Sequence, residues 1–169
     1  MLARCAIHIS VQKRSKPLLR IVLFIVTASF VPCAHAAQVR VQNPCAENTW
    51  LNVTLSTVIG SSVGSVTLEA LTNLGVPFQG SEQGIHSIRN TVTGDDALEV
   101  ISDREMRAYG WCYRLNGVEP DLFPDQVFVQ SDADVIDWFF GFAHYKDGNW
   151  VTYCTPTQTI RPTYICSRN

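Results

Sequence analysis

Three carboxylates crowd one short loop, and paired carboxylates are the side chains that many hydrolases use as general acid and base. They are Glu119, Asp121 and Asp125, within residues 118–126 (VEPDLFPDQ). Such catalysis requires a cleft that shifts the pKa of one carboxylate relative to the other. Each aspartate also follows a proline, and this pair is common turn chemistry in which the carboxylate accepts hydrogen bonds from nearby backbone amides. We therefore favour a structural turn, with a hydrolase as the alternative.

A histidine and a group of aspartates offer two further kinds of chemistry. His144 could serve as a base or a ligand, but no local motif pairs it with a serine or cysteine nucleophile, and we expect a hydrogen-bonded histidine at a sheet end. A calcium site is suggested by Asp132, Asp134 and Asp137, because calcium binds several converging oxygen ligands. A calcium loop of the EF-hand type also has a glycine at the turn and a distal glutamate, and this segment has neither. We predict a solvated turn, no metal site and no catalytic residue.

Aromatic side chains give the stronger indication of function. Most of those on the predicted strands must be core, but any that stay uncovered would form an exposed apolar patch, and such patches mark ligand or protein contacts. The predicted ligand-binding residues therefore combine aromatic positions with the acidic loop and the histidine: Trp111, Tyr113, Glu119, Asp121, Phe123, Asp125, Trp138 and His144.

The first 36 residues have the features of a signal peptide. Basic residues without any acidic residue precede the apolar run at 21–31, and Ala34-His35-Ala36 has the small-x-small pattern of a signal-peptidase site. Eleven apolar-dominated residues are too few for a comfortable membrane span. We expect a secreted or periplasmic protein that starts at Ala37 and has no membrane segment after cleavage, with an uncleaved anchor as the alternative.

Residues 37–169 carry an excess of negative charge. They number 133, enough for one domain with a sizeable core, and they hold 8 basic against 15 acidic side chains, a formal charge of −7. Nucleic acids and anionic membrane surfaces require a clustered basic face. The expected partner is therefore a small molecule or a protein, and we expect a monomer.

Four cysteines follow the predicted cleavage site, namely Cys45, Cys112, Cys154 and Cys166. An even number in an oxidising compartment predicts two disulfides, for which three pairings exist. We favour Cys154–Cys166, which closes a short loop, together with Cys45–Cys112. A zinc site is the alternative, but no C-x-x-C pair is present to nucleate it.

Strands and tight turns dominate the second half of the chain. Residues 111–115 alternate as a strand that ends at Asn116-Gly117, a pair that supplies the positive φ of a tight turn. Residues 135–145 are apolar on both alternating sets, which predicts a central strand covered by a helix on at least one side. Asp147-Gly148 then predicts a hairpin into residues 150–153.

The first half predicts weaker strands and one helix. Strands are expected at 38–43, 50–58 and 65–72, with short ones at 85–91 and 127–129. Residues 60–64 suggest a turn or flexible loop. The helix should start near Thr93, because Thr93-Gly94-Asp95-Asp96 has capping-box spacing and Ala97, Leu98, Ile101 and Met106 form an apolar stripe.

This order of elements predicts an α+β fold, a β-grasp-like mixed sheet with one packed helix, stabilised by disulfides. The helix near Thr93, the strand ending in Asn116-Gly117, and Asp134 followed by Trp138 form an ordered set. This set resembles the transcobalamin-like C-terminal domain family, whose members are mostly uncharacterised. The resemblance covers residues 64–153, so the expected organisation is a signal peptide (1–36), an N-terminal extension with one or two strands (37–63), the β-grasp-like domain, and a tail tied by a disulfide (154–169).

The resemblance implies cobalamin as a candidate ligand. The cobalamin carriers bind the vitamin with a second, helical barrel domain that this chain lacks, so we predict no cofactor from the residues themselves. The sequence thus favours an exported, non-catalytic binding module that uses an aromatic sheet face or the 118–126 loop. A secreted hydrolase and an envelope interaction protein that pairs through an exposed sheet edge are the alternatives.

Overall fold

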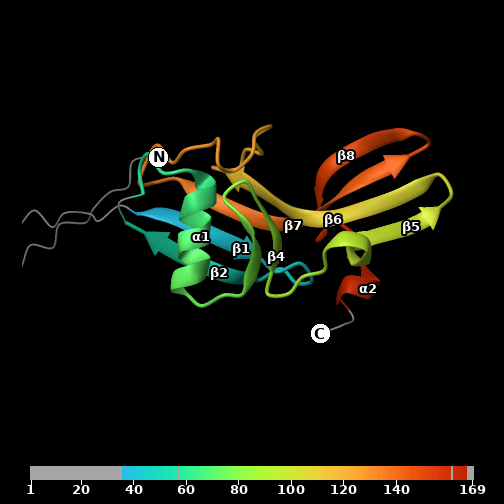
Figure 1. Cartoon of the computed structure of the whole chain (residues 1–169), viewed down its shortest axis with the longest axis horizontal. Coiled ribbons are helices and arrows are strands. Elements are labelled where there is room, and N and C mark those ends of the chain that lie inside the picture. Colours follow the sequence, from blue (N-terminus) through green and yellow to red (C-terminus); the bar gives the residue numbers. More distant parts are fainter. Residues whose placement is uncertain (1–35, 57, 161, 167–169) are drawn as a thin grey trace, which may run out of the picture. The chain divides into compact units, whose positions relative to one another are not determined.

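The computed structural model describes residues 36–56, 58–160 and 162–166, so most of the predicted signal peptide lies outside the described residues. The chain has an α+β fold of strands with few helices (Figure 1). Its elements are β1 (Ala37–Gln42), β2 (Thr49–Leu55), α1 (Val63–Asn73), β3 (Phe78–Ser81), β4 (Gly84–Ile88), the 3-10 helix η1 (Gly94–Ala97), β5 (Leu98–Ser102), β6 (Glu105–Leu115), β7 (Val135–Lys146), β8 (Asn149–Pro156) and α2 (Thr163–Cys166). No described helix is long and apolar enough to cross a membrane.

The main sheet is mixed, and β7 lies at its centre as the sequence predicted. Its strand order is β2-β1-β7-β6-β5, and β8 also pairs with β7. β6 is antiparallel to β7 along its whole length. On the other edge of β7, the first half pairs in parallel with β1 and the second half pairs with β8. The segment preceding α1 therefore belongs to the same sheet, while β3 and β4 form a separate hairpin.

Both tight turns predicted from glycine pairs are present. Asn116 and Gly117 have φ values of 54° and 80°, and Leu115 and Val118 exchange backbone hydrogen bonds across them. Asp147 and Gly148, with φ values of 49° and 88°, connect β7 to β8. Positive φ at both central residues matches the right-handed twist of the flanking strands, so the turn type follows from the sequence.

The prediction of an α-helix that starts near Thr93 is wrong. Thr93 makes no side-chain capping hydrogen bond, and residues Gly94–Ala97 form a short 3-10 helix that ends where β5 begins. The apolar residues that suggested a helical stripe pair across strands instead, since Leu98 lies opposite Ala108 and Val100 opposite Met106. Cross-strand pairing with β6 outweighs the weak local helix signals here, although Leu98, Val100 and Ile101 stay exposed.

The helix forms at α1, where we predicted a strand from the alternation of residues 65–72. Five of its six buried residues follow the helical spacing i, i+3, i+4, i+7, i+8: Val63, Val66, Thr67, Ala70 and Leu71. Ser62 Oγ accepts a hydrogen bond from the Ser65 amide at 3.1 Å, the contact of a helix N-cap. The stretch predicted as a turn or flexible loop is a turn at Gly60, but its last two residues, Val63 and Gly64, are the first residues of the helix.

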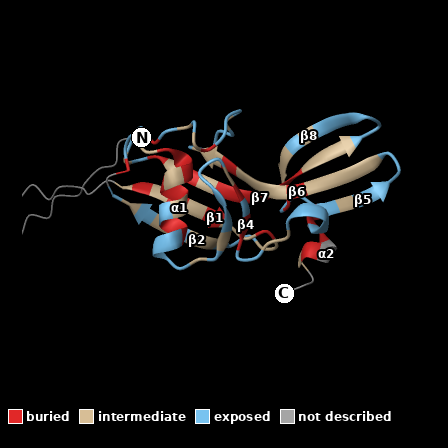
Figure 2. Ribbon diagram, in the orientation of Figure 1, coloured by how far each residue is buried: buried red, intermediate tan, exposed pale blue. Residues whose placement is uncertain are grey.

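An aromatic layer joins the two halves of the sheet. Directly opposed residues of β6 and β7 form the pairs Tyr109–Phe142, Trp111–Phe140 and Tyr113–Trp138, with ring centroids 5.6, 5.3 and 5.4 Å apart. At one end α1 and β4 cover this layer, and the Trp138 indole donates to Thr67 Oγ1 of α1 at 2.9 Å. At the other end Ala97 and Ile165 cover it. Buried residues accordingly concentrate along α1, β1 and β7 (Figure 2).

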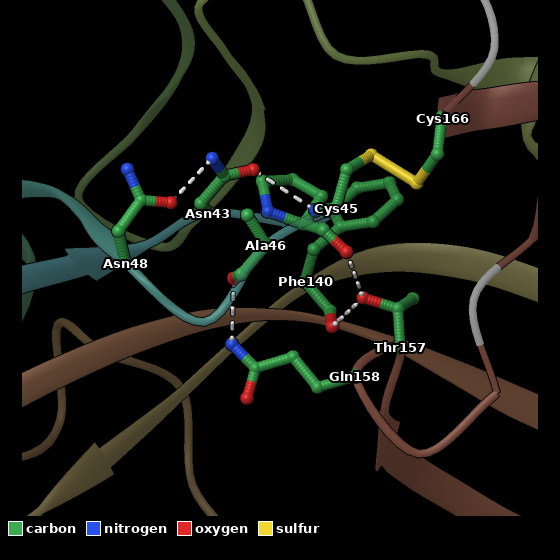
Figure 3. The surroundings of a disulfide bond; sticks show 9 residues. Asn43, Cys45, Ala46, Asn48, Phe140, Thr157, Gln158 and Cys166 are labelled. Atoms are coloured by element: carbon green, nitrogen blue, oxygen red, sulfur yellow. Dashed lines mark hydrogen bonds between the residues drawn. A yellow bond between two sulfur atoms is a disulfide. The ribbon is translucent and has the colours of Figure 1, made fainter.

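Two disulfides are present, but the favoured pairing is wrong. The bonds are Cys45–Cys166 and Cys112–Cys154, with Cα atoms 5.4 and 6.2 Å apart. The β7–β8 hairpin returns Cys154 to the neighbourhood of Cys112, which lies on β6. Separately, the Thr157 hydroxyl contacts the carbonyls of Pro44 and Phe140, at 3.0 Å each, where the chain leads toward Cys166 (Figure 3). The disulfide pairing therefore depends on which strands are neighbours, and this cannot be predicted from the spacing of the cysteines in the sequence.

Candidate functional site

A groove of about 310 Å³ opens where β6, the β3–β4 hairpin and the 118–126 loop meet. We call it the loop groove. Five of the predicted ligand-binding residues line it: Trp111, Tyr113, Glu119, Phe123 and Trp138. The side chains of Leu122 and Phe123 stand at its opening, with exposed fractions of 56% and 65%.

Contacts with α1 and β6 hold the loop in place. The Tyr113 hydroxyl donates to the Leu122 carbonyl at 2.8 Å. At the start of α1, the Gly64 amide donates to the loop carbonyl of Pro124 at 2.9 Å, and the Val63 amide donates at 2.8 Å to the carbonyl of Val127, the residue after the loop. The first amides of a helix have no partner within the helix, and here they donate to carbonyls of this segment. These hydrogen bonds hold the loop against the start of α1.

Tyr113 is a hydrogen-bond donor in this groove. Burial, reinforced by the negative charge of Asp125, raises the pKa of Tyr113 to about 12. The phenol is therefore protonated at neutral pH. It holds the loop and does not act as a base.

Of the three loop carboxylates, Glu119 lines the groove and the other two do not. Glu119 lies 4.0 Å from the Arg114 guanidinium, which also stacks 4.1 Å over the Phe139 ring. Asp121 is exposed and Asp125 is half-buried, and neither lines the groove. The groove is thus lined by one of the three carboxylates and not by the pair that general acid–base catalysis uses.

His144 lies far from the groove. It is opposite Arg107 in the β6–β7 register, six residues along β6 from Tyr113, which corresponds to roughly 20 Å of strand. Its Nε2 atom is 2.8 Å from Glu105 Oε1. This hydrogen bond, with the nearby Lys146, lowers the pKa of the Glu105 carboxyl despite the opposing effect of desolvation. The predicted grouping of His144 with the loop residues is not assembled.

The prediction of a solvated turn is wrong for Asp134, which is buried. It is only 6% exposed and accepts hydrogen bonds from the Asn116 amide and from the backbone amides of Gln130 and Ser131, at 3.0, 2.8 and 3.1 Å. Burial by itself would raise its pKa, but the three hydrogen bonds outweigh that effect and lower it. Within the described part of the chain, no three His, Cys, Asp or Glu side chains converge as a metal site would require.

Sequence reasoning missed several residues of the loop groove. Its remaining apolar walls come from Ile85, Pro120, Leu122 and Pro124, and its rim includes His86. Leu122 could have been recognised, because an apolar pair between two prolines in a polar loop has no sheet or helix to bury it. Ile85 and His86 could not, since only the folding of the β3–β4 hairpin brings them to β6.

No known protein-family profile, no curated protein and no solved structure matches this chain.

Proposed function

We propose that this protein is an exported, non-catalytic binding module and that the loop groove is its ligand site. The observation that carries the proposal is the convergence of aromatic, proline and leucine side chains on one concave surface. Two of these residues, Leu122 and Phe123, are exposed. Concave, mainly apolar sites with a few polar groups are the usual form of small-molecule sites.

The chemistry of the groove favours a small, mainly apolar ligand with one polar group. The walls are aromatic or aliphatic, and the polar side chains at the rim are few, chiefly Glu119 and His86. An apolar ligand would release water from the exposed Leu122 and Phe123 side chains, and this release supplies the driving force for binding.

We further propose export and a β-grasp-like arrangement, each of which agrees with one feature of the structure. Two disulfides agree with an oxidising environment. A helix packed on a mixed sheet agrees with a β-grasp-like arrangement, although the helix is α1 and not the segment near Thr93. The resemblance to the transcobalamin-like family keeps cobalamin among the ligands to be tested.

Thermal melting of the oxidised protein with cobalamin, cobinamide, oligosaccharides and short apolar peptides tests the proposal. A ligand that binds only the folded state raises Tm in a saturable way. Phe123→Ser should weaken that binding more than tenfold, since burying a phenylalanine contributes about 1.5–3 kcal/mol. It should leave the Tm of the free protein unchanged, because Phe123 is exposed.

Val118→Ser is the matched control, because Val118 belongs to the same loop, is equally exposed and does not line the groove. Equal ligand affinities of the Phe123 and Val118 variants would rule out the loop groove as the site.

The interaction-protein alternative is favoured by one observation on β8. This strand pairs with β7 along one edge, its sequence NWVTYCTP holds no charged residue, and it exposes Trp150, Val151 and Tyr153. Charged side chains usually protect sheet edges from pairing with other chains. An uncharged, apolar edge of this kind suits pairing with a strand of a partner protein.

A further inference from the structure

A second cavity, of about 490 Å³, shares no lining residue with the loop groove. Its walls include Trp50, Arg89, Asn90, Thr91, Val92 and Ile165. Cys45 of the Cys45–Cys166 disulfide also lines it. Arg89 is the one charged residue among its described lining residues, in a chain with an excess of acidic side chains.

Arg89 occupies a backbone conformation that suits glycine better. Arg89 and Asn90 have φ values of 52° and 59°, and the Thr91 amide donates to the Ile88 carbonyl at 3.2 Å. This is a turn with both central residues in the left-handed region, a type in which Asn-Gly is typical. A long side chain at such a position costs conformational energy, and residues held in this way cluster at functional sites.

Thr91 holds this turn rigidly. Its hydroxyl accepts from the Ile88 amide at 3.1 Å and from the Trp111 indole at 2.8 Å, and its carbonyl accepts from Ser87 Oγ at 2.8 Å. The Arg89 amide donates to the Pro77 carbonyl at 2.8 Å. These hydrogen bonds hold the backbone of the turn in the conformation that places Arg89 at the cavity.

The Arg89 guanidinium has no acceptor among the described residues. It lies 5.5 Å from the centroid of the Trp50 ring, a cation–π contact that leaves its N–H groups available. The other described cationic side chains each lie beside an acceptor: Arg40 at Gln38, Arg104 at Asp147, Arg107 at Glu99, Arg114 at Glu119 and Lys146 at Glu105.

We propose that this cavity, the Arg89 pocket, binds a small organic carboxylate with an apolar body. A guanidinium presents paired N–H donors that match a carboxylate. Trp50, Val92 and Ile165 supply apolar walls for the rest of the molecule. A single cation with apolar walls suits a monoanion better than a phosphate dianion, which would require more donors.

Titration of the oxidised protein with 4-phenylbutyrate tests the pocket. Binding is monitored by the fluorescence of Trp50 and its neighbours and by amide NMR shifts at residues 88–92. We expect saturable binding that perturbs those amides. The neutral analogue 4-phenylbutanamide, butyrate and inorganic phosphate should each bind at least tenfold more weakly. Absence of saturation by 4-phenylbutyrate, or equal binding of phosphate or of the amide, overturns the proposal.

Three variants locate the interaction. Arg89→Gln should weaken 4-phenylbutyrate binding tenfold or more, as loss of a charge-assisted hydrogen bond does. Arg89→Gly should lose binding to the same extent while Tm does not fall, because glycine accepts φ of 52° without strain. Arg104→Gln changes the net charge equally at an exposed hairpin and should bind as the wild type does. Wild-type affinity in both Arg89 variants would exclude this residue as the anchor. These variants leave the loop groove intact, so the outcome is independent of the function proposed for it.

Discussion

Asn116, Asp134 and Trp138, which carried the family resemblance, all have structural roles. The Asn116 side chain donates to Asp134 and accepts from the Val135 amide at 2.9 Å, which joins the turn after β6 to the start of β7. The Trp138 indole is bonded to Thr67 of α1. These residues therefore position the strands of the sheet, and a resemblance that rests on them indicates architecture more than a shared ligand.

Asp134→Asn should lower the free energy of unfolding by about 1–3 kcal/mol, because the amide cannot accept all three hydrogen bonds and places an N–H group against a donor. Urea denaturation at neutral pH measures the loss. Asp132→Asn is the control, since Asp132 lies in the same turn and no change is expected there.

The effect of Asp134 should depend on pH with a defined sign. Its folded pKa is lowered, so its contribution is complete above the unfolded pKa of about 4 and is lost as the pH falls through the folded value. The stability difference between wild type and Asp134→Asn should therefore shrink below about pH 4. A difference that stays constant down to pH 2 would contradict the assignment of the shift to Asp134.

At the scale of elements, β6, β7 and β8 are held together around one glycine. Gly141 lies on β7, and a Cβ atom there would lie 3.3 Å from Cys112 Sγ and 3.1 Å from the Thr155 carbonyl oxygen. The absence of a side chain at Gly141 lets the Cys112–Cys154 disulfide and β8 approach β7 closely.

Gly141→Ala should cost about 1–3 kcal/mol, the range for overpacked sites, because the added methyl presses against backbone and sulfur atoms. Gly110→Ala is an exact positional counterpart, since Gly110 pairs with Gly141 across the strands and nothing lies within 4 Å of its Cβ position. That change should be neutral or slightly stabilising. Thermal or urea unfolding of the two variants compares them, and equal losses would refute the close-approach argument.

The helix prediction failed because the position of the helix depends on contacts between elements. The segment near Thr93 and the segment of α1 both carry weak signals, with helical spacing in α1 obscured by the polar Thr67 among the buried residues. Thr67 is buried because its hydroxyl donates to the Val63 carbonyl and accepts from Trp138. A polar residue satisfied by a distant indole cannot be recognised as core from sequence spacing alone.

In the whole molecule, the two disulfides close loops of very different length. Cys45–Cys166 joins residues 121 positions apart, and Cys112–Cys154 joins residues 42 apart. In the chain-entropy model such bonds contribute about 5 and about 4 kcal/mol respectively, because longer loops restrict the unfolded chain more. Both values are large against the net stability of a domain of this size.

Replacing both Cys45 and Cys166 by Ser should lower the urea midpoint at least as much as replacing both Cys112 and Cys154. Removing either bond should cost a few kcal/mol, and dithiothreitol should lower the Tm of the wild type. An unchanged Tm after thiol titration has shown both bonds to be reduced would mean that the disulfides do not contribute to stability.

The sequence by itself determined the features that depend on neighbouring residues. Asn-Gly and Asp-Gly specify tight turns through their backbone preferences, residues 135–145 specify a central strand through apolarity on both faces, and four cysteines indicated two disulfides. Tertiary structure alone decided the location of the helix, the disulfide pairing, and which site residues meet. Each of these depends on contacts between residues far apart in the chain, such as Thr67 with Trp138 or Cys45 with Cys166. Local spacing does not reveal such contacts, because they form only when segments far apart in the chain pack against each other.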